Sequence, residues 1–150
     1  MGDSRLNEQE ALKMERTVLI IDDSEDDILL TKMVLSKIGQ RVKADTALSG
    51  EAGLALLRCA TALPSLVLLD LKMPKLGGIE VLRKIRDDER LRRLPVLIVT
   101  HSELESDREA SYRAGANGVL HKAVDIDHFR RELEQVMSNW IGSDKPEKIA

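Results

Sequence analysis

The chain has very few aromatic side chains, and this limits both its core and its partners. Tyr112, Phe129 and Trp140 are the only three in 150 residues. The core must therefore be built from aliphatic side chains, and stacking platforms for single-stranded nucleic acid are essentially absent. The formal net charge of −3 gives no overall field that would attract nucleic acid. We expect no nucleic-acid partner.

Cysteine and long apolar runs are equally scarce. Cys59 is the only cysteine, which excludes an internal disulfide or a cysteine-cluster metal site and favours a reducing, cytoplasmic location. We expect Cys59 itself to be a small buried apolar side chain. No run approaches the length that spans a bilayer, and the polar first sixteen residues contain no signal-peptide core. No membrane partner is expected.

What the chain does contain is a regular alternation of apolar strands and helical patterns. We predict strands at 17–22, 41–47, 65–70, 95–100 and 117–121, and helices at about 25–38, 50–59, 79–85, 104–114 and 126–140. Such alternation predicts a doubly wound α/β fold, with five helices covering both faces of a five-stranded parallel sheet. The predicted organisation is an N-terminal extension (1–16), one domain (17–141) and a short charged tail (142–150) in which no output domain fits.

The first predicted helix has a clear start signal. Ser24 stands at the N-cap position and acidic residues follow it in the first turn, where the helix dipole favours them. Apolar residues then recur at three- and four-residue steps and predict the face that the helix buries. These residues are Leu29, Leu30, Met33, Val34 and Ile38.

Polar side chains follow the buried strands at the point where each strand ends. Asp22 and Asp23 follow the first strand, Asp70 closes the third, Thr100 closes the fourth and Lys122 follows the fifth. Right-handed crossovers place the carboxyl ends of parallel strands at one edge of the sheet, which is where ligands bind in such folds. We therefore expect these five side chains to converge.

Three carboxylates in one pocket call for a cation. At about 5 Å and an effective dielectric near 20, each pair of charges repels by roughly 3 kcal/mol. The donors are hard oxygens with no histidine or thiolate among them, which favours Mg²⁺ over zinc. With Lys122 and Thr100 beside it, Asp70 would be suited to act as a nucleophile that forms an acyl phosphate.

The chain resembles response-regulator receiver domains. The matching segments are 20–24 (IIDDS), 68–74 (LLDLKMP), Gly78, 99–100 (VT) and 121–122 (HK), and the resemblance spans about residues 17–141. It implies a flavodoxin-like fold with strand order 2-1-3-4-5. It also implies that the protein is not an enzyme beyond catalysing its own phosphorylation and dephosphorylation.

The resemblance implies a role for each matching residue. Asp70 would accept a phosphoryl group from a sensor histidine kinase. Asp22, Asp23, Asp70 and the backbone carbonyl of Lys72 would hold Mg²⁺. Thr100 would be the switch hydroxyl and Lys122 the lysine that pairs with phosphate.

Two positions depart from the family pattern, and two others lie where family members adjust the rate of dephosphorylation. Ala123 stands where receivers usually have proline after the lysine, and Val119 stands where many have an aromatic that moves with the switch threonine. Lys72 and Ser102 occupy positions at which family members tune dephosphorylation. Our hypothesis is that Lys72 shields the acyl phosphate and lengthens its life; the alternative is a lysine that only faces solvent.

The expected output is binding to a downstream protein. Segments 23–27 (DSEDD) and 92–95 (RRLP) most resemble single-domain regulators that serve bacterial and cyanobacterial phytochrome kinases, which would imply a homodimer. Trp140 and Ile141 could form its contact or could simply cap the monomer's core. Two alternatives stay open: a pseudo-receiver that binds partners without phosphorylation, and a haloacid-dehalogenase-type phosphohydrolase. The hydrolase chemistry requires a second acid two residues after the nucleophile, where this chain has Lys72.

Overall fold

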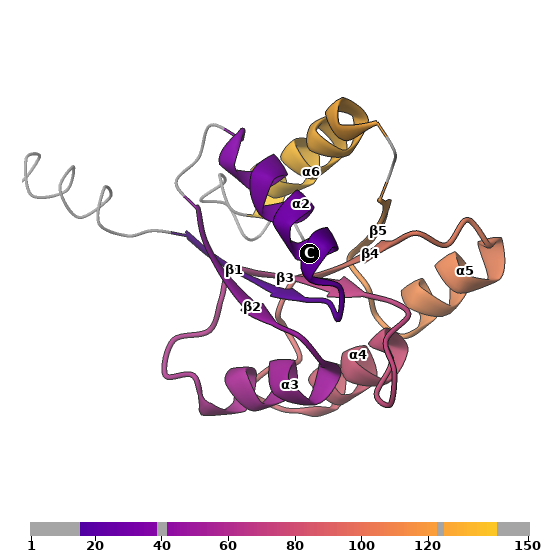
Figure 1. Ribbon diagram of the computed structural model, residues 1–150. Helices are drawn as coiled ribbons and strands as arrows, with labels where there is room; N and C mark the ends of the chain where they lie inside the picture. Colours follow the sequence, from indigo (N-terminus) through magenta and orange to yellow (C-terminus); the bar gives the residue numbers. More distant parts are fainter. Residues whose placement is uncertain (1–15, 39–41, 123–124, 141–150) are drawn as a thin grey trace, which may run out of the picture.

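The structure is a computed structural model that describes residues 16–38, 42–122 and 125–140. Within these residues a five-stranded parallel sheet has the order β2-β1-β3-β4-β5 (Figure 1). The strands are β1 (Arg16–Ile21), β2 (Val42–Ala47), β3 (Leu66–Asp70), β4 (Val96–Thr100) and β5 (Gly118–His121). The helices are α2 (Glu25–Ser36), α3 (Gly50–Cys59), α4 (Gly78–Asp87), α5 (Glu105–Arg113) and α6 (Ile126–Trp140). The predicted fold class and strand order are confirmed.

Two aliphatic cores lie on opposite faces of the sheet. Val18 and Ile20 face α2 and α6, where they pack with Phe129 and other apolar side chains. Leu19 and Ile21 face α3 and α4 on the other side (Figure 1). Successive strand residues alternate between faces, so a continuous apolar run is what a sheet covered on both sides requires. The central strands β3 and β4 are buried along their whole length.

The face that α2 buries differs from the prediction. Ser24 caps the helix as expected, because its side chain accepts a hydrogen bond from the Asp27 backbone N–H. Leu29 and Met33, however, are 64% and 41% exposed. The buried residues of the helix are Ile28, Thr31, Val34 and Leu35. Apolar residues run along two sides of this helix, so spacing alone did not determine which side meets the sheet.

Cys59 was also predicted wrongly, since it is exposed at the C-terminal end of α3. The helix buries Leu54 and Leu57 against the sheet. Cys59 lies two residues beyond Leu57 and therefore about 200° around the helix, so it points away from that side.

Gly78 lets α4 begin directly against the end of β3. A Cβ atom on this residue would lie 2.3 Å from the backbone oxygen of Asp70, and the Gly78 N–H donates to the carbonyl of Leu71 at 2.9 Å. Only glycine permits so close an approach. This contact fixes the turn after β3 and therefore the position of Asp70 at the end of the strand.

No helix in the part of the chain that the structure describes is long and apolar enough to cross a membrane.

Candidate functional site

Three carboxylates meet at the carboxyl edge of the sheet. Asp22 and Asp23 directly follow β1, and Asp70 is the last residue of β3. One oxygen from each lies within 4.8 Å of the others, with Asp22 and Asp70 buried and Asp23 exposed. The turn that follows β1 orients Asp22, because its Oδ1 accepts a hydrogen bond from the Ser24 backbone N–H at 3.0 Å. The predicted convergence of these residues is present in the structure.

Lys122 reaches this cluster from the end of β5. Its backbone N–H donates to the Thr100 carbonyl at 2.8 Å, which fixes where its side chain starts. Its Nζ lies 2.6 Å from Asp22 Oδ2, 3.2 Å from Asp70 Oδ1 and 3.0 Å from Asp27 Oδ2. The buried ammonium therefore has three carboxylate partners.

Asp27 is a site residue that the sequence analysis missed. It lies in the first turn of α2, and its Oδ2 accepts from Lys122 Nζ and lies 3.0 Å from His101 Nε2. The helix dipole is a sufficient local reason for acidic residues in the first turn of this helix, so the contact with Lys122 was not expected. A usable signal was present, because Asp27 lies in the first turn of a helix that begins directly after the acidic pair Asp22 and Asp23 and therefore stays close to that edge of the sheet.

The charges in the site shift one another's pKa values. Burial raises the pKa of Asp70 to about 6, with Asp22 and Asp23 adding to the rise and Lys122 opposing it. For Lys122, burial alone would lower the pKa, but hydrogen bonds and charges of Asp22, Asp27 and Asp70 outweigh it and raise the pKa. For Asp27, burial opposes the change, yet Lys122 and His101 lower the pKa. Burial thus makes the negative charge of Asp70 costly to hold.

The donor set fits a small divalent cation. Asp22, Asp23 and Asp70 offer oxygen atoms only, and the exposed side of the cluster leaves access for water molecules. Mg²⁺ and Mn²⁺ prefer such carboxylate and water ligands. A bound cation would also reduce the repulsion from Asp22 and Asp23 that adds to the effect of burial on the pKa of Asp70.

A cavity of about 380 Å³ opens beside Asp70. It is lined by Asp23, Asp27, Asp70, Lys72, Thr100, His101 and Ser102. Thr100 is buried at the end of β4, and its Oγ1 accepts a hydrogen bond from the Ser102 N–H at 3.0 Å. Lys72 and Ser102, the two predicted tuning residues, therefore both border the cavity that Asp70 faces.

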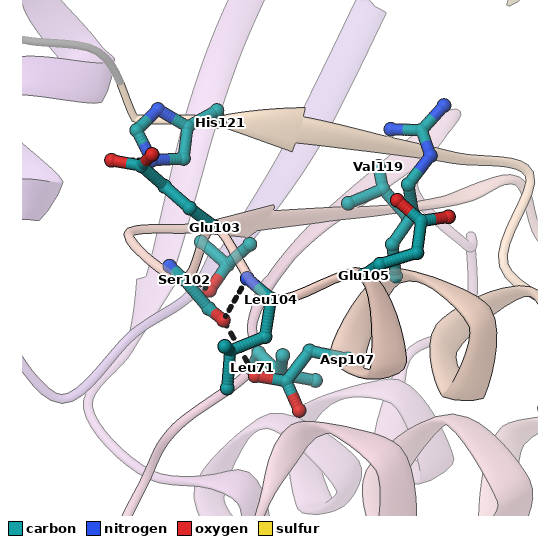
Figure 2. Close-up of a pocket in the computed structure, with 10 residues that line it drawn as sticks. Leu71, Ser102, Glu103, Leu104, Glu105, Asp107, Val119 and His121 are labelled. Carbon is teal, nitrogen blue, oxygen red and sulfur yellow. Dashed lines mark hydrogen bonds and ion pairs between the residues drawn. The ribbon is translucent and has the colours of Figure 1, made fainter.

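Val119 lies outside this cavity. It lines a neighbouring cavity of about 460 Å³, together with Thr100 and residues of the segment that leads into α5 (Figure 2). Thr100 and Ser102 border both cavities. Ala123 and Ile141 lie outside the described residues, as does the side chain of Trp140.

The sequence matches the response regulator receiver domain family over residues 18–134. The chain belongs to this family. The matched residues include strands β2 to β5, most of β1, and the three carboxylates of the acidic site. The predicted relationship to receiver domains is therefore confirmed, and receivers are signalling proteins rather than enzymes of the usual kind.

Among curated proteins, this receiver domain is similar to the protein PilH of Pseudomonas aeruginosa. The two are 34% identical, over 81% of this chain and 97% of PilH. PilH is therefore matched over nearly its whole length by a single receiver domain.

Two solved structures are similar to this chain over most of their length. One is the phosphorylated cyanobacterial phytochrome response regulator RcpA, 27% identical with a TM-score of 0.76, over 85% of this chain and 94% of RcpA. The other is the Mn²⁺-bound form of response regulator Rcp1, 30% identical with a TM-score of 0.75, over 85% of this chain and 96% of Rcp1. A divalent cation is thus bound by a similar receiver, which agrees with the acidic cluster found in this chain.

Proposed function

We propose that this protein is a stand-alone two-component response regulator that accepts a phosphoryl group on Asp70 from a sensor histidine kinase. The observation that carries the proposal is the grouping of Asp70 with two further carboxylates and the buried ammonium of Lys122. Thr100 at the adjacent strand end completes the group. The arrangement suits phosphoryl transfer, in which positioning and charge neutralisation supply most of the catalysis.

In the proposed reaction, an Asp70 carboxylate oxygen attacks phosphorus. The new oxygen–phosphorus bond forms as the nitrogen–phosphorus bond of the kinase phosphohistidine breaks, and the electron pair of that bond stays on the histidine nitrogen. Asp22, Asp23, Asp70 and the Lys72 backbone carbonyl would hold Mg²⁺, which supplies positive charge to the transferring group. The reaction ends with one acyl phosphate and leaves the protein's other bonds unchanged.

Lys122 and Thr100 would bind the transferred group. The Lys122 ammonium already contacts Asp70 at 3.2 Å, so a phosphoryl group on that carboxylate would lie next to a fixed positive charge. The Thr100 hydroxyl, whose oxygen accepts a hydrogen bond from the Ser102 N–H, would turn to donate its own hydrogen to a phosphoryl oxygen. That change at the end of β4 would alter the segment leading to α5 and bias the protein between two states.

The proposed output is binding to a downstream protein, and the protein catalyses only its own phosphorylation and dephosphorylation. The match to nearly the whole length of PilH supports a regulator that works as a single receiver. Similarity to RcpA supports a phytochrome-type kinase as partner. A homodimer and the division into an N-terminal extension, a receiver and a tail belong to the same proposal. So does a cytoplasmic location, which the single cysteine favours.

Phosphotransfer from purified kinases tests the proposal. Cytoplasmic parts of several sensor kinases, including a phytochrome type, would be labelled with radioactive phosphate and mixed with the regulator and Mg²⁺. We expect label to move within seconds from one kinase to wild-type protein and to Asp26→Asn, an exposed acid control, but not to Asp70→Asn. Equal labelling of Asp70→Asn would contradict the assignment of the acceptor. Preferential transfer from a non-phytochrome kinase would contradict only the proposed partner.

A further inference from the structure

Asp107, on helix α5, binds both of the tuning residues at the phosphorylation site. Its Oδ2 accepts a hydrogen bond from the Ser102 hydroxyl at 2.5 Å and lies 3.3 Å from the Lys72 ammonium. Lys72 follows β3 and Ser102 follows β4, so one carboxylate oxygen joins the two loops that border Asp70. Figure 2 shows Ser102 and Asp107 joined in this way.

The three residues stand between two cavities. Lys72 lines the cavity that contains Asp70, Asp107 lines the neighbouring one with Val119, and Ser102 lines both. Asp107 is therefore close enough to bind the Lys72 ammonium but is not itself part of the phosphoryl pocket. Its place is fixed by α5, where its backbone carbonyl accepts a hydrogen bond from the buried Ser111 hydroxyl at 2.8 Å.

The contact between Lys72 and Asp107 can be exchanged easily. The Lys72 side chain is 67% exposed and that of Asp107 21%, so water screens the pair and the lysine keeps its freedom to move. A phosphoryl group carries about two negative charges near neutral pH, whereas Asp107 carries one. Phosphorylation of Asp70 would thus offer Lys72 a stronger partner across the same cavity.

We propose that Asp107 is a positioning residue that holds the Lys72 ammonium away from Asp70, and that Lys72 exchanges Asp107 for the phosphoryl group after phosphorylation. This inference rests on the proposed function of Asp70. In the phosphorylated protein Lys72 divides its time between the two anions. When it lies on the phosphoryl group it blocks the approach of water, so Asp107 shortens the life of the acyl phosphate by drawing the lysine away.

The movement of Lys72 from Asp107 to the phosphoryl group would also link the phosphorylation site directly to α5. Release of Lys72 changes the charge around Asp107, which lies in the first turn of that helix. Charge in a first turn acts on the helix dipole and on the exposed backbone N–H groups there. A route of this kind needs no aromatic side chain at Val119.

The hydrolysis rate of the acyl phosphate reports the position of Lys72. In that reaction a water oxygen bonds to phosphorus while the bond from phosphorus to the Asp70 oxygen breaks. The electron pair returns to the Asp70 carboxylate, phosphate leaves, and a proton passes to solvent. The half-life would be measured after phosphorylation with acetyl phosphate and Mg²⁺ and removal of the donor.

A double-mutant cycle tests the inference. We expect Asp107→Asn to lengthen the half-life about two- to five-fold, the range set by a partly exposed ion pair. Lys72→Ala should shorten it, and the double variant should match Lys72→Ala because no lysine remains to be repositioned. Glu105→Gln removes a charge from the same helix turn without touching Lys72 and should leave the half-life unchanged.

Two results would overturn this inference without affecting the proposed function. One is an unchanged half-life of the acyl phosphate in Asp107→Asn. The other is that Asp107→Asn changes the half-life by the same factor whether or not Lys72 is present. The second result would mean that Asp107 acts through Ser102 or by supporting the loops. Asp107→Ala repeats the cycle if the asparagine variant does not fold. If wild-type protein takes up no phosphoryl group, the proposed function fails and this inference fails with it.

Discussion

Lys122 holds together a group of carboxylates that would otherwise repel one another. Its ammonium contacts Asp22, Asp27 and Asp70 in a buried position. Even so, the pKa of Asp70 is raised to about 6, chiefly by burial. The site is therefore held in a state that favours an incoming cation, because a positive charge beside Asp70 would relieve the cost of its ionisation.

Asp70 should make the metal-free protein less stable at neutral pH. Its carboxyl group has a higher pKa in the folded chain than its ordinary value of 3.8, so folding opposes its ionisation. The resulting loss of folding stability is absent below the ordinary pKa and grows as the pH rises. It reaches its full size above about pH 6. This rise in pKa corresponds to a cost of at most about 3 kcal/mol, which water at the open side of the site reduces.

Asp70→Asn tests this directly by urea unfolding in the presence of a chelator. We expect the variant to be more stable than wild type by about 1–3 kcal/mol at pH 7.5, with the gap narrowing as the pH falls from 6 to 4. Asp45→Asn, which changes an exposed acid on β2, controls for net charge. A gap that is constant over this pH range, or of the opposite sign, would show that burial of Asp70 does not have this effect.

At the scale of elements, the strand ends could be predicted and the face of α2 could not. Asp22, Asp70 and Thr100 each follow an unbroken apolar run, and parallel topology alone brings such ends together. The buried face of α2 depends on where the chain leaves β1. Since the helix has apolar residues on two sides, local spacing did not choose between Leu29 and Leu35.

Asp27 and Asp107 illustrate the same limit at the site. Both stand in the first turns of helices, where acidic residues are common and have a local explanation in the helix dipole. Their contacts with Lys122 and Lys72 join segments 95 and 35 residues apart in sequence. Such pairs depend on how the helices pack against the sheet, which the spacing of residues along the chain does not reveal.

Two leucines of α2 provide a matched test of its packing. Leu35 is 4% exposed and Leu29 is 64% exposed. Leu35→Ala should lower the free energy of unfolding by about 2–5 kcal/mol, because it leaves a cavity under the helix. Leu29→Ala should change it by no more than about 0.5 kcal/mol. Urea unfolding of both variants checks this, and equal losses would contradict the observed orientation of α2.

At the scale of the whole molecule, metal binding should be linked to folding. The three carboxylates come from β1 and β3 and the turns that follow them, so the site exists only when the sheet is formed. At a Mg²⁺ concentration one hundred times its dissociation constant, the folded protein gains about 2.7 kcal/mol. For a domain of this size, that raises the unfolding temperature by about 5–10 °C.

Asp23→Asn should lose most of this Mg²⁺-induced rise in unfolding temperature, because it removes one charged ligand from an exposed position without disturbing the core. Asp26→Asn, an exposed acid in the first turn of α2, should keep it. Thermal unfolding with and without Mg²⁺ makes the comparison. A rise of equal size in wild type and Asp23→Asn would place the cation elsewhere.

The most direct test of the central claim is intact-protein mass spectrometry after incubation with acetyl phosphate and Mg²⁺. We predict that the wild-type protein gains one phosphoryl group, that the gain requires Mg²⁺, and that Asp70→Asn gains none. An unmodified wild-type protein would contradict the account and favour a pseudo-receiver that binds partners without phosphorylation. Rapid turnover of small phosphate esters without a lasting adduct would contradict it in favour of a phosphohydrolase.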